Sequence, residues 1–111
     1  MTDPAPMPRP PIPLPKDPAA LLLDWQEFAD RREGMIHAMS GGLWLHRHLW
    51  KGHRLAHLVS SDRERLLRWG QRVGMPDERL QYRPLKKDPR DAVRRDAWHW
   101  DLGGPYLPPR R

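Results

Sequence analysis

The histidines of this chain are concentrated in one short stretch. Four of the six lie between His46 and His57, in the segment HRHLWKGHRLAH. Imidazoles bind metals, transfer protons and contact phosphate near neutral pH, so a cluster of them indicates a site. The chain has no cysteine, which excludes thiolate zinc sites, cysteine nucleophiles and disulfide scaffolds. A metal in this protein would therefore be held by imidazole and carboxylate groups.

The spacing of these histidines predicts a β-hairpin. Apolar and aromatic or imidazole side chains alternate over residues 43–50, which is the period of a strand. With residues 51–52 as a two-residue turn, His46 would lie opposite His57, with His48 on the same face. These three imidazoles could hold one zinc or similar ion and leave a position open for water, as catalytic sites do.

Other interpretations of this stretch stay open. Lysine disfavours the positive φ that the first residue of such a turn needs, so residues 43–50 could instead be a loop or a helical turn. The histidines could simply bond backbone groups or stack on Trp44 and Trp50. They could also bind an anion or transfer a proton without a metal.

A second group is the segment WHWD, from Trp98 to Asp101. In an extended backbone His99 and Asp101 share a side, and a carboxylate beside a histidine raises its pKa and fixes its tautomer. The pair could work in acid–base chemistry or in a metal site. The alternative is a structural segment whose tryptophans fill a small core.

The charge balance favours anionic partners. Twenty basic and fourteen acidic residues give a net charge of +6, and most of the excess lies after residue 61 as arginine. Arg65, Arg68 and Arg72 would share one face of a helix, where they could contact nucleic acid or an acidic protein. A solvated basic surface is the other interpretation. The sequence contains no phosphate-binding glycine loop, GxSxG elbow or HExxH pattern.

The chain length and its proline distribution predict one small domain. Residues 1–16 are proline-rich and are expected to form a disordered arm, residues 17–107 the domain, and residues 108–111 a basic tail. Asp17-Pro18 offers a cap followed by proline, and the apolar spacing after it predicts a helix over residues 18–33.

The remaining patterns predict two short strands and two more helices. The strands are expected at residues 35–39 and 55–59. Ser61 and Glu64 have capping-box spacing, which predicts a helix over residues 62–73. A further short helix is expected after Asp88-Pro89, ending near Trp98. The fold class is α+β, with two or three short strands packed against two or three helices.

No segment approaches the roughly 20 continuous apolar residues of a membrane span, and the N-terminus lacks the basic-then-apolar order of a secretory leader. Together with the lack of cysteine, these features favour a cytoplasmic protein without a membrane partner. The sequence does not indicate an oligomeric state.

Four short motifs follow one another along the chain: MIHAM at 35–39, AHLVSSD at 56–62, LLRWGQRVGMP at 66–76 and HWD at 99–101. In these motifs, residues 35–102 resemble a bacterial family, domain of unknown function family 4031. The family pattern has an acid where this chain has Met39 or Ser40, and a tyrosine where it has Trp100. The resemblance implies that His57, His99 and Asp101 are the positions of interest, and that residues 40–52 form a loop.

These observations together lead to two functional expectations. The first is a polar pocket of His57, His99 and Asp101, joined by His46 or His48, that carries out metal-assisted hydrolysis or phosphoester chemistry. The second is a binding module without catalysis, in which the arginine faces and the proline-rich arm contact nucleic acid or an acidic protein.

Overall fold

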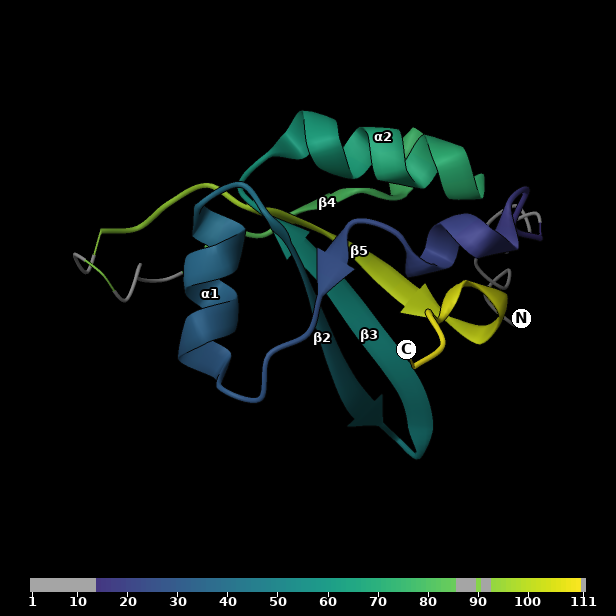
Figure 1. The fold of residues 1–111 in the computed structure, drawn as a ribbon, viewed down its shortest axis with the longest axis horizontal. Coiled ribbons are helices and arrows are strands. Elements are labelled where there is room, and N and C mark those ends of the chain that lie inside the picture. The colour runs from purple at the N-terminus through teal and green to yellow at the C-terminus, as the bar shows by residue number, and fades with distance from the viewer. Residues whose placement is uncertain (1–13, 86–89, 91–92, 111) are drawn as a thin grey trace, which may run out of the picture.

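The computed structural model describes residues 14–85, 90 and 93–110 as one mixed α/β domain (Figure 1). The elements in chain order are the 3-10 helix η1 (Pro18–Leu22), β1 (Trp25–Gln26), α1 (Arg31–Met39), β2 (Leu43–Trp50), β3 (His53–Ser60), α2 (Arg63–Val73), the 3-10 helix η2 (Asp77–Arg79), β4 (Gln81–Tyr82), β5 (Trp98–Gly103) and the 3-10 helix η3 (Gly104–Tyr106). The α+β prediction is confirmed at this level.

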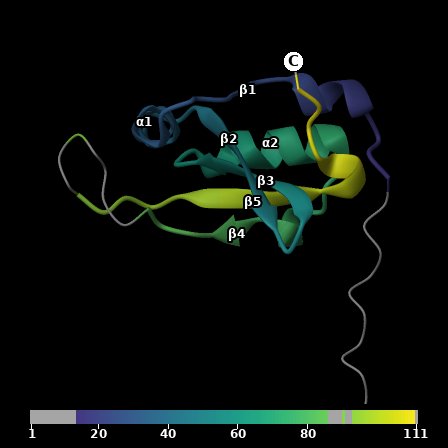
Figure 2. The ribbon, with the colours of Figure 1, turned by 90° about the horizontal axis from the view of Figure 1, so that it is seen from below.

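The strands form one sheet in the order β1-β2-β3-β5-β4. Among the three long central strands, β2 and β5 each pair antiparallel with β3, while the two-residue β1 runs parallel to β2. The two-residue β4 pairs with β5 on the other side, where Figure 2 shows it. The sheet therefore has five strands, more than the two or three predicted.

The main core lies on the face of the sheet covered by η1 and α2. Leu58 and Trp100 of the sheet pack there against Leu66 and Trp69 of α2. Trp100 also donates a hydrogen bond from its indole nitrogen to the carbonyl oxygen of Leu66, at 2.9 Å. The amphipathic spacing of α2 is what allows it to cover this face.

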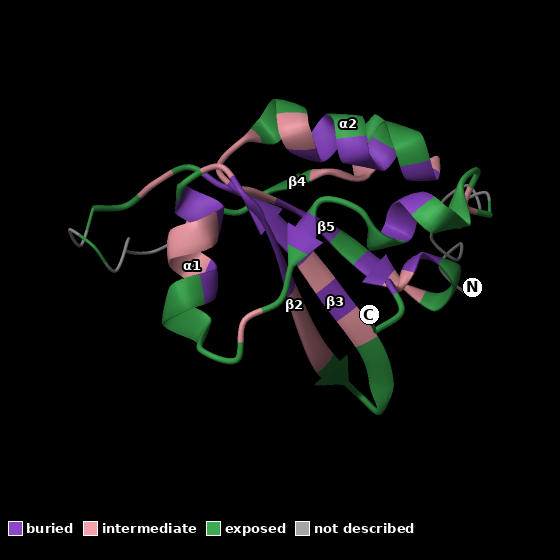
Figure 3. Cartoon of the chain, in the orientation of Figure 1, coloured by how far each residue is buried: buried purple, intermediate pink, exposed green. Residues whose placement is uncertain are grey.

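A smaller core lies on the opposite face, beneath α1. Its buried residues are Ala38, Met39, Trp44, Val59 and Ala97. This helix covers only one end of its face, and Figure 3 shows that the β2–β3 hairpin becomes more exposed toward its turn. His46, His48 and His57 lie on this face, between the smaller core and the hairpin turn.

The predicted hairpin and its register are confirmed. His46 lies opposite His57, His48 opposite Leu55 and Trp50 opposite His53. Lys51 has φ 49° and Gly52 has φ 79°, the positive values of a tight two-residue turn. The loop that the family resemblance implied for residues 40–52 is therefore wrong over β2.

The helix predicted over residues 62–73 is confirmed as α2. Its cap differs from the prediction, because the carboxylate of Asp62, not Ser61, accepts a hydrogen bond from the backbone N–H of Arg65 at 3.0 Å. The helix ends at Gly74, whose φ of 93° suits a residue without a Cβ.

The helix predicted over residues 18–33 is wrong. Its first turn forms as η1 and its last three residues begin α1, but Asp24 between them adopts a φ of 69° that a helix cannot contain. Trp25 instead joins the sheet beside Leu43 and fills the main core. The apolar residues of this segment are spaced as in a helix, but an irregular stretch of chain buries them instead.

The strand predicted at residues 35–39 is also wrong, because α1 occupies those positions. The helix begins earlier, where the carboxylate of Asp30 accepts a hydrogen bond from the backbone N–H of Arg32 at 2.9 Å. Gly34 lies inside this helix, although glycine more often ends a helix than continues it. A Cβ there would come 2.2 Å from the Trp44 ring, so only glycine fits.

The helix predicted after Asp88-Pro89 falls largely on residues 86–89 and 91–92, which lie outside the described part of the chain. Its predicted end near Trp98 is wrong, because Trp98 begins strand β5. Arg95 forms an isolated antiparallel bridge to Leu85 just before it. The alternation of WHWD is therefore that of a strand.

Both predicted domain boundaries lie next to packed chain. The predicted arm, 1–16, is mostly outside the described residues, but the N–H of Lys16 donates to the carbonyl oxygen of Val73 at 2.9 Å. At the other end, Pro108 is fully buried and its carbonyl oxygen accepts a hydrogen bond from Arg47. No helix in the described ranges is long and apolar enough to cross a membrane.

The contact between Gly70 and Trp100 predicts a large effect of a small substitution. In Gly70→Ala the new Cβ would lie 2.3 Å from Cζ2 of the Trp100 ring, which is itself fully buried. We expect the free energy of unfolding to fall by about 2 kcal/mol, measured by urea denaturation. Arg68→Ala, on the exposed side of the same helix, is the control and should stay within about 0.5 kcal/mol. Equal stability of the two variants would contradict the packing described.

Candidate metal and catalytic site

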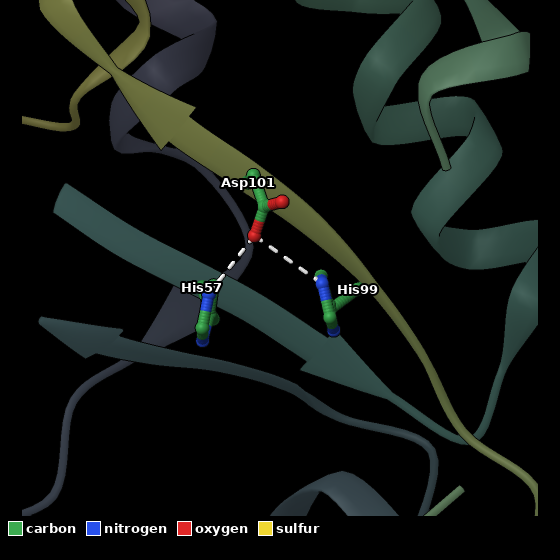
Figure 4. A group of neighbouring side chains, drawn as sticks. All are labelled: His57, His99 and Asp101. Carbon is green, nitrogen blue, oxygen red and sulfur yellow. Dashed lines mark ion pairs between the residues drawn. The ribbon is translucent and has the colours of Figure 1, made fainter. Parts of the chain in front are cut away.

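Two adjacent strands bring together His57, His99 and Asp101. His57 lies in β3 directly opposite Asp101 of β5, and His99 lies two residues before Asp101 on the same face. Their side chains leave the face opposite the main core and point toward one another (Figure 4). The register of the β3–β5 pair thus joins residues that are more than forty positions apart in the chain.

Both imidazoles contact the same carboxylate oxygen. Nε2 of His57 is 2.9 Å from Oδ1 of Asp101, and Nε2 of His99 is 3.2 Å from that atom (Figure 4). The His99 side chain is 7% exposed, that of His57 37% and that of Asp101 54%. The group therefore has a buried floor and a solvent-facing edge, where a ligand can enter.

His46 and His48 extend this group into a row of rings on the same face. The ring centroids of His46 and His48 are 6.3 Å apart, those of His48 and His57 4.4 Å, and those of His57 and His99 4.7 Å. The predicted common face of His46, His48 and His57 is thus present. Within the described chain, however, the compact group of potential ligand atoms is His57, His99 and Asp101, whose atoms all lie within 4.8 Å of one another.

The surroundings favour neutral imidazoles. Burial lowers the pKa of His57 to about 4, the charge of His99 acts in the same direction, and the carboxylate of Asp101 opposes both. Burial also lowers the pKa of His99 and, in part, that of His46. A neutral imidazole has a lone pair available for a metal ion, so these rings are in the ligating form near neutral pH.

Two separations within the compact group suit a tetrahedral metal ion. Bonds of about 2.0 Å to imidazole nitrogen and carboxylate oxygen place neighbouring ligand atoms about 3.3 Å apart. The two distances from Asp101 Oδ1, 2.9 and 3.2 Å, are close to this value, and all three ligand atoms lie within 4.8 Å of one another.

A groove of about 460 Å³ opens beside the group. It is lined by His48, Trp50, Leu55, Ala56, His57, Arg83, Asp101, Leu102 and Gly103. Two members of the compact group, His57 and Asp101, thus form part of its wall. A substrate lying in this groove would have direct access to Asp101 and His57.

The arginines that the sequence suggested as anion contacts lie elsewhere. Arg65, Arg68 and Arg72 belong to α2, which covers the face of the sheet opposite the histidines. Arg65 donates to the carbonyl oxygen of Gly41 at 3.1 Å, and Arg72 pairs with Asp24 at 3.4 Å. The predicted role of these residues in binding nucleic acid remains a prediction, but it concerns a surface separate from the groove.

Sequence reasoning found His57, His99 and Asp101 but missed Arg83. Arg83 follows β4 directly and lines the groove, and its charge lowers the pKa of His99. The sequence contains no local sign of this, because Gln81-Tyr82 is too short to be recognised as a strand. Trp50 was named only as a stacking partner for histidine, and it too lines the groove.

Comparisons of the chain with protein-family models, with curated proteins and with solved structures find no match. The resemblance to domain of unknown function family 4031 therefore stays a prediction.

The lowered histidine pKa values predict a loss of stability in mild acid. Because histidines of the unfolded chain take up protons near pH 6.5 and His57 of the folded chain only near pH 4, acid favours unfolding. The free energy of unfolding of the metal-free protein should be constant above pH 6.5 and fall between pH 6.5 and 4. His57→Gln removes one such group, so urea denaturation should show a shallower fall.

An NMR titration of the metal-free protein measures the pKa values of these histidines directly. The imidazole resonances of His57 and His99 should both titrate below pH 6.5, with His57 near pH 4. A midpoint at or above pH 6.5 for His57 would contradict the burial of this ring.

Proposed function

We propose that this protein binds one divalent transition-metal ion through His57, His99 and Asp101 and uses it to hydrolyse an ester or phosphoester. The observation that carries the proposal is the convergence of two imidazole nitrogens on one carboxylate oxygen at a solvent-facing groove. Three such side chains are the usual protein ligand set of a catalytic zinc site, in which the remaining position stays open.

The donor types support zinc or a similar ion over magnesium or calcium. Imidazole nitrogen suits zinc, copper, iron and nickel, whereas calcium and magnesium take oxygen ligands. Here two of the three donor atoms are imidazole nitrogens. An ion of this kind, held by His57, His99 and Asp101, would supply Lewis-acid chemistry and would lower the pKa of a bound water molecule toward neutrality.

His48 is placed to assist the group. Its ring centroid is 4.4 Å from that of His57, and its Nδ1 atom is buried with no hydrogen-bond partner in the described residues. A buried nitrogen without a partner is costly, and such atoms in proteins often have a functional role. His48 therefore provides either an additional ligand or a proton acceptor for the water, which accounts for an otherwise unpaired atom.

Metal binding is the first test of the proposal. Metal-free protein titrated with Zn²⁺ at pH 7.5 in a calorimeter should bind one ion. His57→Gln and Asp101→Asn each remove one ligand while nearly keeping side-chain shape, and each should weaken binding by at least about 10-fold. Circular dichroism and thermal unfolding of each variant check that the fold is kept.

His53→Gln is the matched control. His53 lies in the same strand and on the same face as His57 but is exposed and near the hairpin turn. Its replacement should leave the affinity for Zn²⁺ unchanged. Failure of the native protein to bind Zn²⁺, or an equal loss of affinity in His53→Gln, would overturn the site.

Hydrolysis is tested on the zinc-loaded protein. Release of nitrophenol from a nitrophenyl ester and from bis(nitrophenyl) phosphate should require the ion, stop on chelation and return when Zn²⁺ is added back. Asp101→Asn at saturating Zn²⁺ should lose the activity. Turnover that survives chelation, or none with either substrate class, would overturn the hydrolytic part of the proposal.

A further inference from the structure

We propose that the groove beside His57 and Asp101 binds a nucleotide, with a phosphate group held by Arg83 and a base stacked on Trp50. This inference rests on the proposed function, because the phosphoester would be the substrate of the same site. Its two residues, Arg83 and Trp50, belong neither to the histidine group nor to the arginines of α2.

Arg83 supplies the positive charge that a phosphate needs. Its side chain is exposed, lines the groove together with Asp101 and forms no ion pair with any described residue. Guanidinium groups bind phosphate through parallel, charge-assisted hydrogen bonds. An anion placed between Arg83 and the metal ion would compensate both positive charges.

Trp50 supplies a stacking surface at the hairpin end of the same groove. Its side chain is 57% exposed, although large aromatic side chains are usually buried. The ammonium group of Lys51 lies 4.7 Å from the centre of the Trp50 ring, which places a further cation beside the aromatic surface. Exposed aromatics with adjacent cations are the common means of binding nucleotide bases and their backbone.

The spacing of these groups suits an extended ligand. Trp50 lies opposite His53, and His53 is four residues from His57 along β3, a separation of about 13 Å. A single phosphate ion could not reach from Arg83 and the metal site to Trp50. A mononucleotide or a short single strand has its phosphate and its base far enough apart to contact both ends of the groove.

The reaction at this site would be hydrolysis of the phosphoester. The oxygen of a water molecule forms a bond to phosphorus, and the bond between phosphorus and the leaving ester oxygen breaks. One proton of that water ends on the leaving oxygen, so the products are an alcohol and a phosphate. No oxidant, reductant or further reactant is needed.

Binding is measured on the full-length, zinc-loaded protein, and Zn²⁺ occupancy is determined in the same samples. The probes are adenosine monophosphate, a fluorescently labelled ten-nucleotide single-stranded DNA and inorganic phosphate. Trp50→Ala and Arg83→Ala should each weaken nucleotide binding about 10-fold, as expected for losing one base stack or one charged hydrogen-bond donor. Neither variant alters a proposed metal ligand, so Zn²⁺ occupancy should be unchanged.

Two variants on the other face of the sheet are matched controls. Leu49→Ala removes an exposed apolar side chain next to Trp50, and Arg68→Ala removes an exposed cation from α2. Both should bind the probes within about 2-fold of the native protein, which is well under 1 kcal/mol. Because Leu49 points away from the groove, its loss tests whether hairpin hydrophobicity alone accounts for binding.

The outcomes separate this inference from the proposed function. Binding of both nucleotide probes, or of only one, with the stated loss in Trp50→Ala and Arg83→Ala supports the inference and identifies the form of the ligand. Normal Zn²⁺ occupancy without nucleotide binding overturns the inference alone. The inference is also overturned if inorganic phosphate binds as tightly as the nucleotide probes and Trp50→Ala has no effect on nucleotide binding. The same holds if Arg68→Ala loses as much nucleotide affinity as Trp50→Ala and Arg83→Ala. Missing Zn²⁺ occupancy overturns the proposed function on which the inference rests.

Discussion

The pairing of β2 with β3 is the constraint on which the rest of this structure depends. A two-residue turn fixes the register, and the register places His46 opposite His57 and Trp50 opposite His53. Since side chains alternate between faces, a shift of one residue in either strand would turn the imidazoles of that strand toward the opposite face of the sheet. The turn forms although Lys51 must adopt a positive φ, so the benefit of pairing seven residues of each strand outweighs the local cost.

Elements whose patterns are dominated by local interactions could be predicted from the sequence. The hairpin, its register and α2 belong to this group, because alternation, spacing and helix caps are encoded within about ten residues. The segments 18–33 and 35–39 were predicted wrongly because distant parts of the sheet decide their structure. Trp25 forms a parallel pair with Leu43, and Gly34 fits inside a helix only because Trp44 lies against it.

The candidate site was predictable only in part for a similar reason. The alternation of WHWD indicates that His99 and Asp101 share a side, and the family resemblance pointed to His57. That His57 meets Asp101 follows from the β3–β5 register, which joins strands separated by α2 and the whole segment after it. Arg83 lies at the groove because it directly follows β4, a strand of two residues that no sequence pattern reveals. The placement of α2 on the opposite face also separates its arginines from the imidazoles.

Both α-helices contact the sheet through a glycine that faces an indole ring, Gly34 against Trp44 and Gly70 against Trp100. Glycine inside a helix costs about 1 kcal/mol relative to alanine, so each helix is weakened before it meets its partner. Helices of nine and eleven residues are already too short to persist alone in water. Neither helix is therefore stable by itself, and both depend on the surface of the sheet, with its two indole rings, to stay folded.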